Sequence, residues 1–255
     1  MNAPYNPGGG LISKLGRRWA RIAARAPLNV DLDHAIVSFT FDDFPQSAAT
    51  TGAAILEARD WRGTYYASAG FAGTRNHHGA MFEADDLQRL DAAGHEIGCH
   101  THTHQDGSQI SAGEMLADID RNLQALRELG YQGELESFAY PYGEVTPATK
   151  RLLATRFGSM RGVHAAINRG SCDRSLLKSV PIDGGETGVA RAVDAARSLI
   201  QHPGWLIFYM HDVQDEPTEW GCTPAQLERV CAAVEQSGAR VMTVAAAMTK
   251  IGDSQ

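Results

Sequence analysis

Strand-like and helix-like segments alternate along the chain from residue 35 to residue 250, and this alternation restricts the possible folds more than any other feature. Short apolar runs rich in β-branched and aromatic residues predict strands over residues 35–41, 63–68, 95–100, 136–140, 176–182, 205–210 and 240–244. Alternating β and α segments indicate a parallel sheet. Seven predicted strands in 255 residues favour a barrel over an open doubly wound sheet, and no glycine-rich phosphate motif follows the first strand.

Two of the intervening segments carry clear helix signals. Ser111 and Glu114 predict a capping box at the start of one helix, which runs to about residue 130. Thr223 predicts the cap of another, which ends at Gly238. Both helices follow predicted strands, as a barrel of alternating elements requires.

Charge and composition exclude two classes of partner. The net charge is −7 and the pI is about 5.8, so we expect no basic surface for nucleic acid. No run of about 18 apolar residues exists, so we expect no membrane span. The first ten residues are polar and lack the apolar part of a secretory signal, which predicts a cytoplasmic protein with reduced cysteines. We expect residues 1–28 to be an extension, partly flexible or a short basic amphipathic helix, and residues 29–255 to be one barrel domain.

The stretch FTFDDFP, residues 39–45, raises an electrostatic problem. A segment that we predict to be a buried strand ends in two adjacent carboxylates, Asp42 and Asp43. Two buried anions repel each other, and each is costly to bury without a partner. They therefore form either a solvated turn or part of a cation site. Where the backbone leaves the sheet, adjacent carboxylates can diverge, so that one ligates a cation and the other stays free as a base.

A histidine cluster in residues 94–106 supplies further metal-binding groups. Its members are His95, His100, His102 and His104. Imidazoles together with a carboxylate suit Zn²⁺ or a similar ion such as Co²⁺. A helical turn would place His100 and His104 on one face, whereas an extended chain would pair His100 with His102. The spacing predicts a metal site with Asp43 as its anionic ligand and leaves both histidine pairs open.

Four short motifs occur in a fixed order along the chain. They are TFDD (residues 40–43), HTHTH (100–104), YPYG (140–143) and FYMHD (208–212). Together they resemble the motifs of the polysaccharide deacetylase family, which is also called the NodB-homology or carbohydrate esterase 4 group. The resemblance implies an α/β fold with a distorted, partly open (β/α)7-type barrel. It also implies a Zn²⁺-type metal and hydrolysis of an N-acetyl group.

The resemblance further implies a role for each matched residue. Asp42 would be the general base, His211 the general acid, and the backbone N–H of Tyr142 part of an oxyanion hole. The implied metal ligands are Asp43, His100 and His104. His102 would lie between the two histidine ligands as a spacer or an outer neighbour.

This sequence departs from the family pattern at two points. The third motif usually begins with an arginine that orients the base, but Ala139 stands there. Arg161 is our candidate for the missing guanidinium. The partner of the acid His211 also lacks a clear match, and we predict Asp183 for that role. Asp173 and Asp212 are the alternatives.

Two loops near the predicted site carry further side chains of interest. His77 and His78, within residues 70–86, would either touch substrate or, as we expect, be exposed loop histidines. Trp220 would either stack on a sugar ring or pack under its own loop.

Three functions are compatible with these features. The first is a metal-dependent N-deacetylase of an N-acetylated sugar in glycan, lipopolysaccharide or capsule precursor metabolism. The second keeps the metal chemistry but hydrolyses a small cyclic amide or ureide. The third is a catalytically silent carbohydrate-binding domain on the same fold. Nothing in the sequence predicts the oligomeric state.

Overall fold

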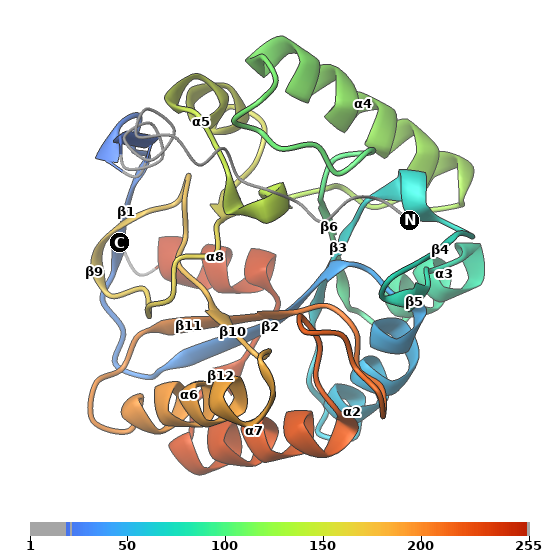
Figure 1. The fold of residues 1–255 in the computed structure, drawn as a ribbon. Helices are drawn as coiled ribbons and strands as arrows, with labels where there is room; N and C mark the ends of the chain where they lie inside the picture. The colour runs from blue at the N-terminus through green and yellow to red at the C-terminus, as the bar shows by residue number, and fades with distance from the viewer. Residues whose placement is uncertain (1–18, 21, 254–255) are drawn as a thin grey trace.

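A curled parallel β-sheet, surrounded by helices, forms the centre of the computed structural model, which describes residues 19–20 and 22–253 (Figure 1). Its strands follow the order β10, β11, β2, β3, β6, β7, β8, and β12 pairs with β2 beside this path. These strands are β2 (Ile36–Asp43), β3 (Thr64–Ala67), β6 (Glu96–Cys99), β7 (Ser137–Ala139), β8 (Ser159–Arg161), β10 (Val180–Pro181), β11 (Trp205–Met210) and β12 (Arg240–Val241). All neighbours in this sheet run parallel, as the alternating sequence pattern predicts.

The sheet curls without closing into a regular barrel. Its edge strands are β8 and β10, and a single isolated bridge joins Arg161 of β8 to Leu177, which lies in the segment before β10. The Gly162 N–H donates to the Leu177 carbonyl at 3.0 Å, and no longer ladder forms there among the described residues. The predicted distorted, partly open barrel of seven strands is therefore confirmed.

Seven helices are described around this sheet, and both predicted helix starts are confirmed. The Ser111 hydroxyl accepts from the Glu114 N–H at the start of α4, and Thr223 caps α7 in the same way. The helices are α2 (Ala53–Glu57), α3 (Ala84–Ala92), α4 (Ala112–Glu128), α5 (Pro147–Leu153), α6 (Gly185–Ser198), α7 (Pro224–Ser237) and α8 (Val244–Gly252). Short helical turns occupy Ala48–Gly52, Ala69–Phe71 and Pro141–Gly143.

Several short strands differ from the sequence-based expectation. Strand β8 was not expected, because its three residues carry too little pattern to be recognised. The strand expected over residues 176–182 is reduced to β10. Two antiparallel ribbons, β1 (Pro27–Val30) with β9 (Gly170–Asp173) and β4 (Arg75–Asn76) with β5 (Gly79–Ala80), also form outside the main sheet. Such short strands are defined by pairing partners that lie far away in sequence or in a tight turn.

Strand β2 lies in the middle of the sheet, and all eight of its residues are buried. It pairs with β11 along one side, and with β12 and then β3 along the other. The apolar cluster around Phe39 and Phe41 fills the space on one face. Asp42 and Asp43 are therefore the last residues of a buried central strand, at the edge where the carboxyl ends of the other strands meet.

Only part of the expected N-terminal extension can be described, since residues 1–18 and 21 lie outside the described residues. Lys150 is fully buried, and its Nζ donates to the Ala20 and Ala23 carbonyls at 3.0 and 2.9 Å. Trp19 and Ile22 are exposed. None of the described helices combines the length and apolarity that a bilayer span requires.

Candidate metal centre and catalytic site

Asp42 and Asp43 point to different partners, because the backbone turns where β2 ends. Asp43 has φ +60° and Phe44 has φ +65°, so the chain leaves the sheet through two left-handed residues. Both carboxylates are 4% exposed. Asp43 faces two histidines, whereas Asp42 accepts a hydrogen bond from Arg161. This divergence answers the problem that two adjacent buried anions raise.

The histidine segment after β6 is a loop rather than a helix or a strand. Thr101 has φ +62° and His104 has φ +54°, so the chain turns sharply between His100 and His104. Asp118 on α4 holds this loop, accepting from the N–H groups of His102 and Thr103 at 2.9 Å each. The turn brings His100 and His104 together, and His102 is not part of the group.

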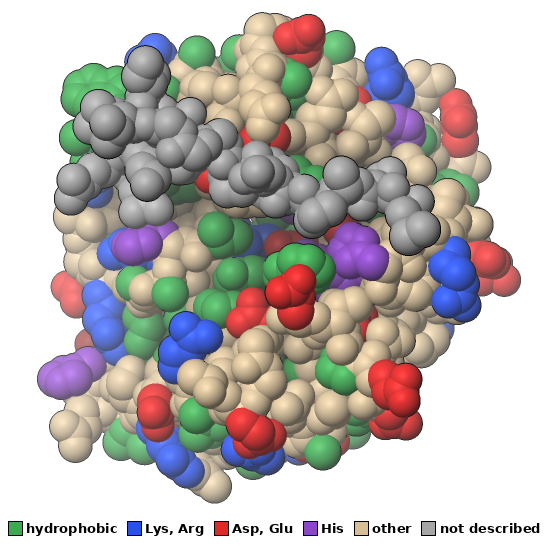
Figure 2. Space-filling view, in the orientation of Figure 1, with side chains coloured by type: hydrophobic (Ala, Val, Ile, Leu, Met, Phe, Trp, Pro, Cys, Tyr) green, Lys and Arg blue, Asp and Glu red, His purple; other side chains and the backbone are tan. Residues whose placement is uncertain are grey.

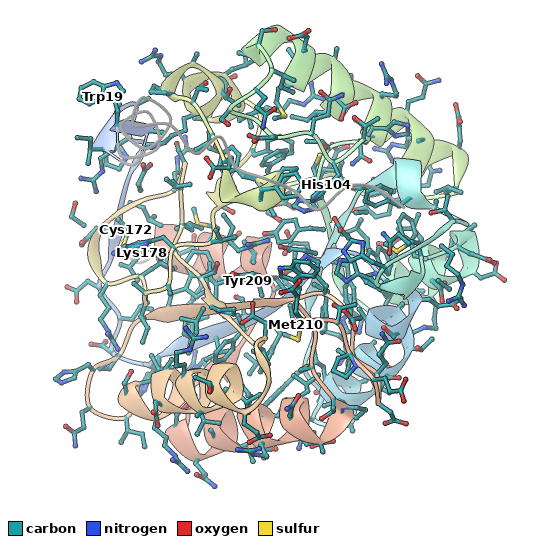
Figure 3. All side chains as sticks on the ribbon, in the orientation of Figure 1. Trp19, His104, Cys172, Lys178, Tyr209 and Met210 are labelled. Atoms are coloured by element: carbon teal, nitrogen blue, oxygen red, sulfur yellow. The ribbon has the colours of Figure 1, made fainter. Side chains whose placement is uncertain are left out.

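Asp43 forms one candidate cation site with these two imidazoles. Its Oδ1 lies 3.6 Å from His100 Nε2 and 3.2 Å from His104 Nε2. His100 Nδ1 lies 2.8 Å from the Ala139 carbonyl and donates to it, which leaves the Nε2 lone pair facing Asp43. The ring planes of His100 and His104 cross at 62°, so both lone pairs can point at one ion. Figure 3 labels His104, which lies near the middle of the molecule.

The donor set fits a divalent cation. Asp43 Oδ1 is buried, and no described residue donates a hydrogen bond to it. Burial acts to raise the pKa of Asp43, but the neighbouring His104 and His100 outweigh this and lower it to about 2. Burial lowers the pKa of His100 to about 4. An ionised carboxylate with neutral imidazoles is the protonation state that ligates a metal, and this set suits Zn²⁺.

Arg161 reaches the second carboxylate from β8. It is fully buried, and its Nη2 donates to Asp42 Oδ1. The guanidinium carbon lies 5.2 Å from the ring centre of Tyr66 and 5.1 Å from that of Tyr209, so two aromatic rings hold it in place. Burial acts to raise the pKa of Asp42, but Arg161 and the nearby histidines lower it overall. Arg161 therefore contacts Asp42, as we expected, and its role in orienting a base stays a prediction.

His211 directly follows β11, and our prediction that Asp183 is its partner is wrong. Its Nδ1 lies 3.3 Å from the Trp220 carbonyl, which takes the place that we assigned to Asp183. Asp183 lies instead near Arg191 and Glu219, and burial raises its pKa. Asp183 lies in a separate loop after β10. Its position near the end of a strand therefore does not place it beside His211.

The two alternative aspartates also have other partners. Asp173 accepts from the buried Nζ of Lys150 at 2.6 Å. Asp212 accepts from His78, whose Nδ1 lies 3.1 Å from Asp212 Oδ1. His211 is thus oriented by a backbone carbonyl, and none of the three aspartates that we considered contacts it.

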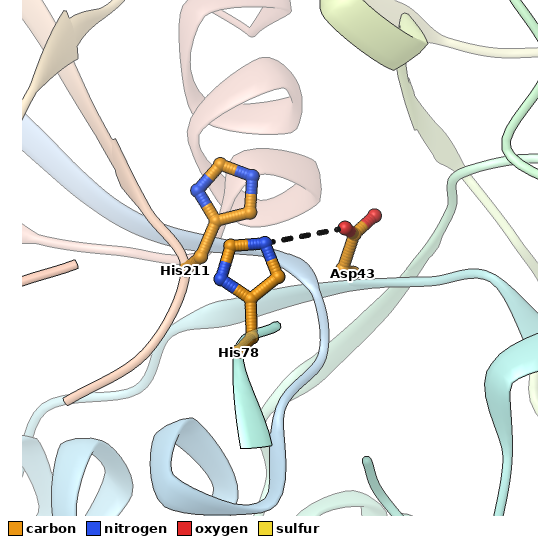
Figure 4. A group of neighbouring side chains, drawn as sticks. All are labelled: Asp43, His78 and His211. Atoms are coloured by element: carbon orange, nitrogen blue, oxygen red, sulfur yellow. Dashed lines mark ion pairs between the residues drawn. The ribbon is translucent and has the colours of Figure 1, made fainter. Parts of the chain in front are cut away.

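His78 is the site residue that the sequence reasoning missed. We expected an exposed loop histidine, which is correct for His77, but His78 is 2% exposed. Its Nε2 lies 3.8 Å from Asp43 Oδ2, and its ring stacks on that of His211 at 4.7 Å (Figure 4). No periodic signal marks a single buried residue in a turn, so only the folded loop reveals it.

Tyr142 lies beside His104 of the candidate cation site, in the turn Pro141–Gly143. Its φ is +58°, and its ring packs edge-on against His104 at 4.5 Å between ring centres. The side chain is 40% exposed. A cavity of about 130 Å³ lies beside it, lined also by Gly143, Val163 and Leu176. The role of the Tyr142 backbone N–H stays a prediction.

Left-handed backbone is concentrated at this site. Among the described residues, seven other than glycine have positive φ, and five of them lie here. These five are Asp43, Phe44, Thr101, His104 and Tyr142. Each such residue costs on the order of 1 kcal/mol or more, and such strain clusters at functional sites. Figure 2 shows histidine side chains reaching the surface on this face of the molecule.

Comparisons with known proteins agree with this geometry. The family model for polysaccharide deacetylase matches residues 29–159, which is 131 of the 255 residues. Among solved structures, the chain is similar to a Xyl-CE4 domain of a multidomain xylanase from the hindgut metagenome of Trinervitermes trinervoides (20% identity, TM-score 0.59, 86% of this chain and 92% of that one).

Two further structures show the range of this similarity. The chitin deacetylase of the fungal pathogen Colletotrichum lindemuthianum has 16% identity and a TM-score of 0.62, over 85% of this chain and 88% of that one. A carbohydrate esterase 4 pseudoenzyme from Bacillus anthracis has 13% identity and a TM-score of 0.60, over 86% of this chain and 68% of that one. At these identities the structures support the fold, while the family model matches the sequence over more than half its length. The chain belongs to the polysaccharide deacetylase family.

Proposed function

We propose that this protein is a metal-dependent hydrolase that removes acetyl from an N-acetylated sugar, in glycan, lipopolysaccharide or capsule precursor metabolism. One observation carries the proposal. The two carboxylates that end β2 have different partners, Asp43 facing two imidazoles and Asp42 facing Arg161. Amide hydrolysis needs both a cation site and a separate base, and this strand end supplies the residues for each.

The metal ligands would be Asp43, His100 and His104. When bound there, a divalent cation would supply positive charge to polarise the amide carbonyl and to lower the pKa of water. Asp42 would take the proton of the attacking water, a role worth about 10²–10⁴-fold in rate. Arg161 keeps Asp42 ionised and fixes the direction of its free oxygen, because one carboxylate oxygen is engaged by the guanidinium.

His211 would complete the reaction by protonating the departing nitrogen. Since its Nδ1 faces the Trp220 carbonyl, its Nε2 remains for the substrate. The Tyr142 N–H would stabilise the developing negative charge on the carbonyl oxygen. The proposed base and acid come from different strands, β2 and β11, which are neighbours in the sheet.

The surroundings of the site are consistent with a sugar. Tyr142 and Trp220 are each 40% exposed, and both contact site histidines. Exposed aromatic rings offer flat apolar faces, which pack against the C–H faces of sugar rings, together with a polar edge. The chitin deacetylase noted above acts on an N-acetylated polymer, which supports the same class of substrate here.

A silent binding domain is the main competing reading, since one of the similar structures is a pseudoenzyme. The residues present here argue for activity. The residues to which we assign the metal, base and acid roles lie close together, and Arg161 contacts the proposed base Asp42 from β8.

Acetate release tests the proposal directly. Protein loaded with Zn²⁺ or Co²⁺ would be incubated with N-acetylated nucleotide sugars, lipid-linked sugars and oligosaccharides, with the Asp42→Asn variant as control. We expect metal-dependent acetate release from at least one substrate and none from the control. Release that persists in Asp42→Asn, or ring opening of cyclic amides without any acetate release, would overturn the proposal.

A further inference from the structure

His78 is a buried histidine of the site to which the proposed reaction gives no role. It occupies the turn between β4 and β5, beside Gly79, which has φ +104°. The His78 N–H donates to the Asn76 side-chain oxygen at 2.8 Å, which fixes the turn. The His78 ring thus enters the site from the turn between β4 and β5, which lies outside the four motifs described above.

A carboxylate holds this ring in one orientation. His78 Nδ1 lies 3.1 Å from Asp212 Oδ1 and 3.2 Å from Thr218 Oγ1. Asp212 is fully buried and also accepts from the Thr218 N–H at 2.8 Å and from Gln214 Nε2 at 2.9 Å. Because an ionised carboxylate only accepts, Nδ1 must carry a proton in this contact. The remaining nitrogen, Nε2, faces Asp43.

Asp43, His78 and His211 also form a group of possible metal ligands, with donor atoms within 4.8 Å of one another. Their ring geometry does not suit an ion. The planes of His78 and His211 are parallel to within 8°, with ring centres 4.7 Å apart. An imidazole lone pair lies in its own ring plane, so the lone pairs of two stacked, parallel rings do not converge on one ion as tetrahedral ligation requires. The crossed rings of His100 and His104 can.

We infer that His78 is a positioning residue, which fixes the ring plane of His211 for proton transfer to the leaving amine. His78 packs against one ring face of His211 (Figure 4). The Trp220 carbonyl holds His211 at Nδ1, and Asp212 anchors His78. This inference rests on the proposed function. Misplacing a catalytic group by about 1 Å can cost about 10²-fold in rate, so an anchored stacking partner has a large effect.

Kinetics of three variants test this role. His78→Ala removes the stacking ring. His78→Phe keeps a flat ring but loses the hydrogen bond from Nδ1 to Asp212. His77→Ala is the matched control in the same turn. We expect His78→Ala to lower kcat by about 10- to 100-fold, with KM within about twofold and metal content unchanged. His78→Phe should fall between Ala and wild type, and His77→Ala should stay within about threefold of wild type.

Three kinetic outcomes would overturn the inference. An unchanged kcat in His78→Ala removes the role, and loss of metal makes His78 a ligand. A raised KM with unchanged kcat assigns it to substrate binding.

A measurement without substrate separates this inference from the proposed function. Ring-proton signals of His211 in the metal-free protein, assigned with His211→Gln, report the stacked ring through its ring current. His78→Ala should shift these signals more than His78→Phe or His77→Ala does. Wild-type protein that releases no acetate contradicts the proposed function, whereas unshifted His211 signals in His78→Ala contradict the placement of His78.

Discussion

Arg161 and Ala139 are direct neighbours in the parallel register of β8 and β7, and the guanidinium of Arg161 reaches Asp42 from there. Ala139 stands where the family pattern usually has its arginine. A guanidinium therefore lies one strand along the sheet from that position, at the same level, and it contacts Asp42. We interpret the absent motif arginine as a relocation within the site, so that the proposed base Asp42 still has a guanidinium beside it.

This relocation predicts that the two positions are exchangeable. Arg161→Ala should lower kcat about tenfold or more, because it removes the group that orients the base. Adding Ala139→Arg to that variant should restore part of the rate. Losing one partner of a buried ion pair costs about 3–5 kcal/mol in stability, so kcat should be measured on protein shown to be folded by circular dichroism. An unchanged kcat in Arg161→Ala contradicts the assigned role.

The same pair predicts a change in pH dependence. The positive charge of Arg161 lowers the pKa of Asp42, so its removal raises that pKa. The base then becomes protonated at higher pH, and the acidic limb of the kcat/KM profile should move to higher pH in Arg161→Met. Arg161→Lys keeps a charge and should move the limb less. An identical limb in all three proteins would show that another group controls it.

Metal content should depend on His100 and His104 but not on the histidine between them. Protein purified without chelator should contain about one divalent ion per chain, measured by elemental mass spectrometry. Three protein ligands with an open fourth position are the usual arrangement of a catalytic zinc site, and this site offers three. The double variant His100→Ala/His104→Ala should lose the ion. His102→Ala is the matched control and should retain it. A metal that persists in the double variant would place the ligands elsewhere.

Asp42→Asn should separate metal binding from catalysis. The amide cannot take a proton from water, so we expect kcat to fall by about 10²-fold or more, with metal content unchanged. Retained metal shows that Asp43 ligates without help from its neighbour. Full activity in this variant would remove Asp42 as the base.

Stability of the metal-free protein should fall as the pH falls from about 6.5 to about 4. Burial lowers the pKa of His100 from 6.5 to about 4, so the unfolded chain binds a proton in this range and the folded protein does not. This shift corresponds to roughly 3 kcal/mol in the free energy of unfolding. That stability is fully present above pH 6.5 and is lost as the pH falls towards 4. Urea unfolding with EDTA at several pH values measures this loss. His100→Asn should flatten the slope, and an equal slope in both proteins contradicts this origin.

The sequence determined those parts of the fold and site that depend on short-range patterns. The alternation of strands and helices required a parallel sheet, and the capping residues Ser111 and Thr223 fixed where two helices begin. Contiguous motifs at strand ends, such as the one that contains Asp42 and Asp43, identified the residues that converge on one edge. These features are local, because propensity, capping and strand alternation act over a few residues.

Tertiary structure alone decided the contacts that join distant segments. The family resemblance implied His104, but the spacing by itself left His102 open. The folded loop brings His104 to Asp43 through the left-handed residues Thr101 and His104 and through Asp118. Arg161 became the partner of Asp42 through strand β8, too short to recognise in the sequence, and His78 became a site residue by the folding of one turn. Each of these contacts depends on burial and on the register between segments that lie far apart in the chain. The contact therefore stabilises the protein only after the sheet has formed.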